Sequence, residues 1–139
     1  MFRMLVIFSL ITFTAACGNF GKFEKPPEPM AKLTGEASQQ QVLDMQSNNE
    51  NFLLLDVRSP EEFDAGHISG AVNISHDQLV SNLNNVFTYK DKNIVVYCRS
   101  GRRARIAIDI LKENSFHHVN HLTGDMNGWQ AAGLKVVTE

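Results

Sequence analysis

The sequence predicts a single α/β domain in three layers, with a mostly parallel, five-stranded sheet and helices on both of its faces. Short apolar runs that suit buried strands alternate along the chain with segments of helical periodicity. The length of 139 residues is enough for one domain with a proper core and too short for two. An apolar fraction of 43% and a charged fraction of 20% are typical of an ordinary globular protein.

The helices have local start signals. Ser38 can cap a first helix, in which Val42 and Met45 share one face. Pro60 suits the first turn of the next, and Gly66 ends it. The predicted helices are 38–47, 60–66, 76–84, 101–113 and 125–132.

The strands are predicted from apolar runs that lie between these helices. The segment 93–97, Asn-Ile-Val-Val-Tyr, is the clearest buried strand of the chain. The other predicted strands are 52–57, 71–74 and 118–122, with a last extended piece at 135–137. In a parallel sheet ligands bind beyond the carboxyl ends of the strands, which draws attention to Cys98, directly after the clearest one.

The N-terminal segment is typical of a targeting signal that lies outside the domain. Arg3 gives a positive start, and the apolar run that follows is shorter than the roughly 20 residues of a membrane span. Small residues lead directly to Cys17, which resembles the bacterial lipobox, although Thr14 stands where that motif usually has Leu. The prediction is a lipoprotein-type signal at 1–16 with lipidation of Cys17. A conventional signal cleaved nearby is the alternative.

Residues 17–37 are rich in Pro and Gly and are predicted to form a flexible tether, followed by the domain at 38–139. The expected location is the periplasmic side of a bacterial envelope, held by the lipid anchor only, with the outer membrane favoured because Gly18 replaces the retention-signal Asp. With Cys17 lipidated, Cys98 has no partner within the chain. A lone thiol in an oxidising compartment is a liability unless its chemistry is used.

The segment from Cys98 to Arg103 joins the best strand to the best helix. Backbone N–H groups at a helix N-terminus stabilise negative charge, and nearby arginines add positive potential, so both favour the thiolate as nucleophile. Gly101 allows a tight turn in which successive N–H groups converge on one centre. The predicted catalytic residue is Cys98, and the predicted substrate-binding residues are Arg99, Ser100, Gly101, Arg102 and Arg103.

Four separate stretches resemble the rhodanese domain family, in particular its small, single-domain, exported members. They are 54–58 with 61–63, 66–74, 95–104 and 124–129, in the usual order and spacing. The resemblance implies the three-layer rhodanese-like fold and a persulfide mechanism without metal or organic cofactor. Cys98 would take the outer sulfur of thiosulfate, or of a persulfide donor, and pass it to an acceptor such as cyanide or a thiol.

Two alternatives stay open. A phosphatase or arsenate reductase of similar architecture has five residues between its loop cysteine and arginine, and here that arginine position is Ala104. A non-catalytic rhodanese-like module that binds protein partners would have no need of Cys98 or of a cationic loop. A net charge of −2 argues against nucleic-acid binding.

Other polar residues are interpreted as structural support near the site. Asp56 and Arg58 lie at the carboxyl end of a predicted strand and are interpreted as part of an ion pair that fixes the loop layer, with Glu62, four residues after Arg58, as the partner considered for Arg58. His67 is expected to form a structural hydrogen bond. The histidines at 117, 118 and 121 lack an acidic or cysteine neighbour in the sequence, and no metal site is predicted.

Overall fold

The computed structural model describes residues 33–138. Its five strands form one sheet in the order β1-β5-β4-β2-β3, and all neighbouring pairs are parallel. The strands are β1 (Glu36–Ala37), β2 (Leu53–Asp56), β3 (Val72–Asn73), β4 (Ile94–Tyr97) and β5 (Val119–Leu122). The helices are α1 (Gln39–Ser47), α2 (Pro60–Asp64), α3 (Arg102–Glu113), α4 (Asp125–Ala131) and the 3-10 segment η1 (Val80–Tyr89).

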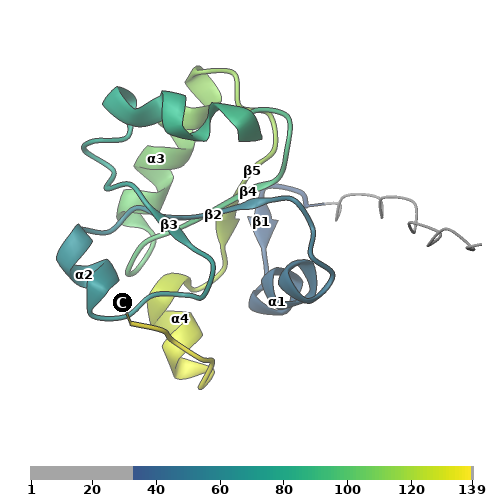
Figure 1. Ribbon diagram of the computed structural model, residues 1–139, viewed down its shortest axis with the longest axis vertical. Helices are drawn as coiled ribbons and strands as arrows, with labels where there is room; N and C mark the ends of the chain where they lie inside the picture. Colours follow the sequence, from purple (N-terminus) through teal and green to yellow (C-terminus); the bar gives the residue numbers. More distant parts are fainter. Residues whose placement is uncertain (1–32, 139) are drawn as a thin grey trace, which may run out of the picture.

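Helices cover both faces of the sheet, as Figure 1 shows, and the predicted fold class is confirmed. Successive residues of β4 point to opposite faces. Ile94 and Val96 pack in one core cluster with residues of α3 and η1, whereas Val95 and Tyr97 pack in a second with residues of α1 and α4. Both faces of β4 are therefore buried, which explains its continuous apolar sequence.

Serine caps fix the starts of two helices. The Ser38 hydroxyl accepts a hydrogen bond from the Gln41 N–H at 3.1 Å, and the Gln41 side chain in turn accepts from the Ser38 N–H. Ser59 and Glu62 form the same reciprocal pair at the start of α2. These capping boxes satisfy N–H groups that lack an intrahelical partner, so each helix begins at a defined residue.

The structure differs from the sequence-based elements in three places. The predicted tether includes residues 36–37, but these form β1 and pair with His121 and Leu122 of β5, so its predicted end is wrong. The helix predicted at 76–84 is instead a run of turns followed by η1. The last extended piece contributes one antiparallel bridge, between Val137 and His67. A two-residue strand is too short to show a periodicity, which is why β1 escaped prediction.

The predicted signal segment 1–16, Cys17 and the first part of the tether lie outside the described residues. Within residues 33–138, no helix has the length and apolar character needed to cross a bilayer.

Candidate active-site loop

Cys98 lies directly after β4, at the carboxyl edge of the sheet where sequence reasoning expects it. The residue is 2% exposed and belongs to the core cluster under α3. Its Sγ nevertheless points toward the loop, because it accepts a hydrogen bond from the Gly101 N–H at 3.1 Å. The sulfur is therefore held against the backbone of its own loop, and any reagent that reaches it must be slim.

Gly101 has a backbone conformation that only glycine adopts easily, with φ at +100°. A Cβ there would lie 3.1 Å from Asp125 Oδ2 and 3.3 Å from Arg105 Nη1. The first hydrogen bond of α3 runs from the Arg105 N–H to the Gly101 carbonyl at 3.0 Å. The N–H groups of the first turn precede this bond and lack intrahelical partners, so the helix presents positive partial charge beside the sulfur.

The loop arginines divide into two groups. Arg99 and Arg102 are exposed, and neither forms an ion pair with any residue in the described part of the chain. Arg103 instead binds Glu62 through two hydrogen bonds of 2.6 and 2.9 Å. The hydrogen bond from Arg103 lowers the pKa of the Glu62 carboxyl to about 2. The free positive charge of Arg103 is therefore smaller than the sequence suggests.

Arg103 also interacts with Cys98. Glu62 is the main cause of the raised pKa of the Arg103 guanidinium, and a smaller contribution comes from a hydrogen bond and charge interaction with Cys98. Glu62 thus holds Arg103 beside the sulfur. The bidentate geometry fixes the plane of the guanidinium, which a single point contact would leave free to rotate.

The Arg58–Glu62 ion pair considered from the sequence is wrong, because Arg58 binds Asp56 instead. Arg58 Nη2 lies 2.6 Å from Asp56 Oδ2, and both side chains are buried. Burial by itself would lower the pKa of the Arg58 guanidinium, but the hydrogen bond to Asp56 and the negative charges around the guanidinium, of which Asp56 is the largest contributor, together outweigh burial and raise the pKa. Arg58 Nη2 also donates to the Gly66 carbonyl at 2.8 Å, so the pair ties the loop after β2 to the end of α2.

His67 is buried with its Nδ1 2.9 Å from the Phe63 carbonyl oxygen. Its ring stacks on the Phe63 ring at a centroid distance of 3.6 Å and an angle of 9°. Its N–H and carbonyl form the bridge to Val137. Each of these contacts organises the connection between α2 and β3, at the same edge of the sheet as Cys98.

Sequence reasoning missed the N-terminus of α4, which holds the Cys98 loop from behind. Asp125 Oδ1 accepts a hydrogen bond from the Cys98 N–H at 2.8 Å, and the Met126 N–H donates to the Cys98 carbonyl at 3.0 Å. The Asn127 N–H donates to the Arg99 carbonyl at 3.1 Å. An acidic residue at the carboxyl end of β5, next to the strand that precedes Cys98, was the available signal.

Among the described residues, the histidines at 117, 118 and 121 do not belong to any group of three side chains that could hold a metal ion. His121 instead lies on β5 with its Nε2 3.0 Å from Asp125 Oδ2. It thereby joins the α4 contacts behind the loop.

The position that carries the loop arginine in phosphatases is occupied by Ala104, which is fully buried in the core. Arg105 is the next residue, and its Nη1 lies 3.3 Å from the point where a Cβ on Gly101 would stand.

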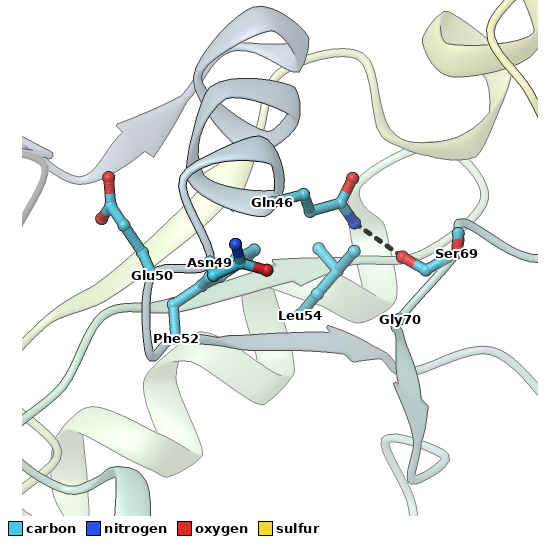
Figure 2. Close-up of a pocket in the computed structure, with 7 residues that line it drawn as sticks. All are labelled: Gln46, Asn49, Glu50, Phe52, Leu54, Ser69 and Gly70. Carbon is cyan, nitrogen blue, oxygen red and sulfur yellow. Dashed lines mark hydrogen bonds between the residues drawn. The ribbon is translucent and has the colours of Figure 1, made fainter. Parts of the chain in front are cut away.

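Two hollows lie at opposite ends of the sheet. The first, of about 350 Å³, is beside the Cys98 loop, and its lining includes Arg58, Arg99, Asn127 and Gln130. The second, of about 430 Å³, lies at the amino end of β2 between α1 and the loop before β3. Figure 2 shows this second hollow, where the Gln46 side chain reaches the Ser69 carbonyl at 2.6 Å.

The sequence model of the family described as "Rhodanese-like domain" matches residues 38–132. This chain belongs to the rhodanese-like domain family. The match covers the whole arrangement around Cys98, from the cap of α1 to the end of α4.

Curated relatives include sulfurtransferases. The chain is 28% identical to a "Sulfurtransferase" of Allochromatium vinosum over 105 residues, which cover 76% of this chain and 96% of that protein. It is 33% identical to "Thiosulfate sulfurtransferase PspE" of Escherichia coli over 70 residues, covering 50% and 67%. The chain spans 25% of a "tRNA uridine(34) hydroxylase" of Wigglesworthia glossinidia brevipalpis, to which the matched part is 37% identical. Rhodanese-like domains therefore occur both as small proteins and as parts of longer ones.

Solved structures agree on the fold. A rhodanese-related protein of Thermoplasma volcanium has a TM-score of 0.63 at 25% identity, covering 76% of this chain and 100% of that chain. A thiosulfate sulfurtransferase of Pseudomonas aeruginosa has a TM-score of 0.71 at 23% identity, covering 76% of this chain and 20% of that chain. The sulfurtransferase relatives together support a rhodanese-family enzyme.

Proposed function

We propose that this protein is a thiosulfate sulfurtransferase, or a closely related persulfide carrier, whose nucleophile is Cys98. The observation that carries the proposal is the Cys98 Sγ held by the Gly101 N–H at the N-terminus of α3. Arg99 and Arg102 stand exposed on the same loop, where they can attract a small dianion. The slim sulfane end of thiosulfate suits a cysteine residue that is only 2% exposed.

The reaction has two transfers. The Cys98 thiolate attacks the outer sulfur of thiosulfate, an S–S bond forms to Sγ, and the original S–S bond breaks with its electron pair leaving on sulfite. Cyanide or a thiolate then attacks the terminal sulfur of the persulfide, and the Cys98 thiolate departs as the leaving group. Loop N–H groups stabilise the negative persulfide between the two steps.

The test measures thiocyanate formed from thiosulfate and cyanide by wild type and by Cys98→Ser. We expect the variant to lose activity while its thermal unfolding curve stays close to wild type. Mass spectrometry of thiosulfate-treated wild type should show one added sulfur on the Cys98 peptide. Equal rates for the two proteins would contradict the proposal. Hydrolysis of an aryl phosphate that depends on Cys98 would favour the phosphatase alternative instead.

We also propose export to the periplasmic side of the envelope with a lipid anchor on Cys17. This rests on the sequence alone, namely the apolar run and the small residues before Cys17. Cys17→Ala should release the protein from the membrane fraction. If the variant remains membrane-associated, the anchor is wrong.

A further inference from the structure

Asp125 is a buried carboxylate that lies directly behind the proposed nucleophile. It is 3% exposed and has φ at +52°, a left-handed conformation that costs a non-glycine residue energy. The preceding Gly124 also has a positive φ, of +82°. Two consecutive residues in this region turn the chain sharply from β5 into α4.

The turn brings the Asp125 carboxylate to two specific partners. Oδ1 accepts from the Cys98 N–H at 2.8 Å, across 27 residues of sequence, and Oδ2 lies 3.0 Å from His121 Nε2. An acidic residue in the first turn of α4 could interact favourably with the helix dipole while keeping a negative φ. The helix dipole therefore leaves the strained conformation unexplained, whereas the bond to the Cys98 N–H is a specific contact that Asp125 makes in this conformation.

The same pair also supports the other side of the loop. Asp125 Oδ2 and His121 Cε1 lie 3.1 and 3.3 Å from the point where a Cβ on Gly101 would stand. Gly101 supplies the N–H that meets the Cys98 sulfur. Asp125 thus fixes the proposed nucleophile by accepting a hydrogen bond from the Cys98 N–H. It also borders Gly101, whose N–H donates to the Cys98 sulfur.

The carboxylate is placed where it opposes the proposed chemistry electrostatically. A negative charge near a thiolate or persulfide destabilises it, and the carboxylate also uses one loop N–H that could otherwise face the anion. His121 can offset the charge by donating to Oδ2. The Asp125 carboxylate disfavours the anion and yet binds the loop backbone. Its role is therefore best explained by the geometry that it imposes on the loop.

We propose that Asp125 is a positioning residue for Cys98, oriented by His121. This inference rests on the proposed sulfur transfer and assigns its geometry to the β5–α4 turn. The hydrogen bond to the Cys98 N–H keeps the sulfur aligned with the Gly101 N–H during both transfers. The acceptor oxygen is the required feature and the negative charge is not.

The experiment compares Asp125→Gly with Asp125→Asn. Glycine adopts φ of +52° without strain but removes the acceptor, whereas asparagine keeps an acceptor oxygen without the charge. We expect Asp125→Gly to lower kcat about 10- to 100-fold, the size of a lost hydrogen bond to a charged group. KM for thiosulfate should stay within about twofold, because the exposed arginines that attract the anion are unchanged, and Asp125→Asn should keep kcat within about threefold.

Asn49→Gly is the matched control, since Asn49 has φ of +53° at the other end of the sheet. It should leave kcat unchanged. Wild-type kcat in Asp125→Gly would overturn the proposal, as would an Asp125→Asn variant that falls as far as Asp125→Gly. The asparagine variant carries the test alone if the glycine variant does not fold, because a loss above about tenfold contradicts an acceptor role.

A second measurement tests the positioning role of Asp125 without thiosulfate as the sulfur donor. Inorganic polysulfide can load the Cys98 thiolate with one sulfur by attack on a polysulfide S–S bond, with the shortened polysulfide leaving. Intact mass spectrometry then follows the lifetime of the persulfide. A shorter lifetime in Asp125→Gly than in wild type and Asp125→Asn supports the positioning role even if wild type does not turn over thiosulfate. Equal lifetimes in all three would overturn it.

Discussion

The two ends of the sheet are built in different ways, and the difference shows how the Cys98 loop is held. At the amino end, the hollow of Figure 2 is bordered by α1 and the loop before β3, and one exposed hydrogen bond, from Gln46 to Ser69, crosses it. At the carboxyl end, buried or bidentate ion pairs and backbone hydrogen bonds converge on the Cys98 loop.

Buried charges cost free energy unless they are paired, so the pairs at the carboxyl end keep their geometry only while each partner is present. We expect substitutions at the carboxyl end to cost both stability and activity, and those at the amino end to cost little of either.

The largest effect should come from Arg58→Met. It leaves the buried Asp56 carboxylate without its partner, so the free energy of unfolding should fall by about 3–5 kcal/mol. Urea unfolding followed by circular dichroism measures this change. A loss below about 1 kcal/mol would show that water or another cation replaces the guanidinium, and that the carboxyl end is less constrained than its contacts indicate.

A pair of glycine substitutions compares the two ends directly. Gly101→Ala and Gly70→Ala both place a Cβ at positive φ, of +100° and +77°, and each should lose about 1–2 kcal/mol of stability. Only Gly101→Ala meets close neighbours and shifts the N–H that binds the Cys98 sulfur. Its sulfur-transfer rate should fall about 100-fold, as when one donor to a developing anion is removed.

Gly70→Ala should keep the wild-type rate, since its Cβ meets only Gln46 Nε2 at 3.7 Å. Steady-state kinetics at matched folded fractions make the comparison. The contrast between the two ends fails if both variants lose activity equally.

The Glu62–Arg103 pair should make stability depend on pH. The pKa of Glu62 in the folded protein is lowered from 4.5 to about 2, chiefly by Arg103. A lowered folded-state pKa contributes stability above the unfolded value and loses it as pH falls toward the folded value. Wild type should exceed Glu62→Gln in stability by about 1 kcal/mol or less above pH 5, given the partial exposure of both side chains.

That difference should shrink progressively as the pH falls from about 4.5 to about 2, where the carboxylate takes up its proton. Thermal unfolding of both proteins across this range provides the measurement. A difference that stays constant with pH would mean that the charge of Glu62 does not matter to the pair.

The smallest effect should come from Gln46→Ala, which removes the hydrogen bond that crosses the amino-end hollow. The bond is exposed, so we expect a loss of about 0.5–1 kcal/mol and an unchanged sulfur-transfer rate. Denaturant unfolding and the thiocyanate assay measure both. A clear loss of activity would reveal coupling between the two ends of the sheet.

The fold and the position of Cys98 could be predicted because both depend on local signals. Apolar runs mark β2 and β4, Ser38 and Pro60 mark helix starts, and the carboxyl end of a parallel strand marks the site. The partners across the site could not be predicted. Arg103 pairs with Glu62, 41 residues away, and Asp125 binds the N–H of Cys98, 27 residues away.

Such pairs form because loops that follow different strands meet in three dimensions. The periodicity of apolar residues along the sequence does not indicate which loops will meet. Charge spacing along one helix favoured Glu62 as the partner of Arg58, since residues four apart can meet there. Arg58 precedes α2, however, and Asp56 is nearer. A local rule was thus applied just outside the element for which it holds.

The strand order has a consequence for how the molecule matures. Glu36 of β1 pairs with His121 of β5, and the Gly35 N–H donates to the Asn120 side chain at 3.0 Å. The sheet thus cannot be completed until β5 has been synthesised, and until then β4 has an unpaired apolar edge that other chains can recruit. Folding of this domain is therefore expected to be completed only after β5 has been made, with aggregation as its main competitor until then.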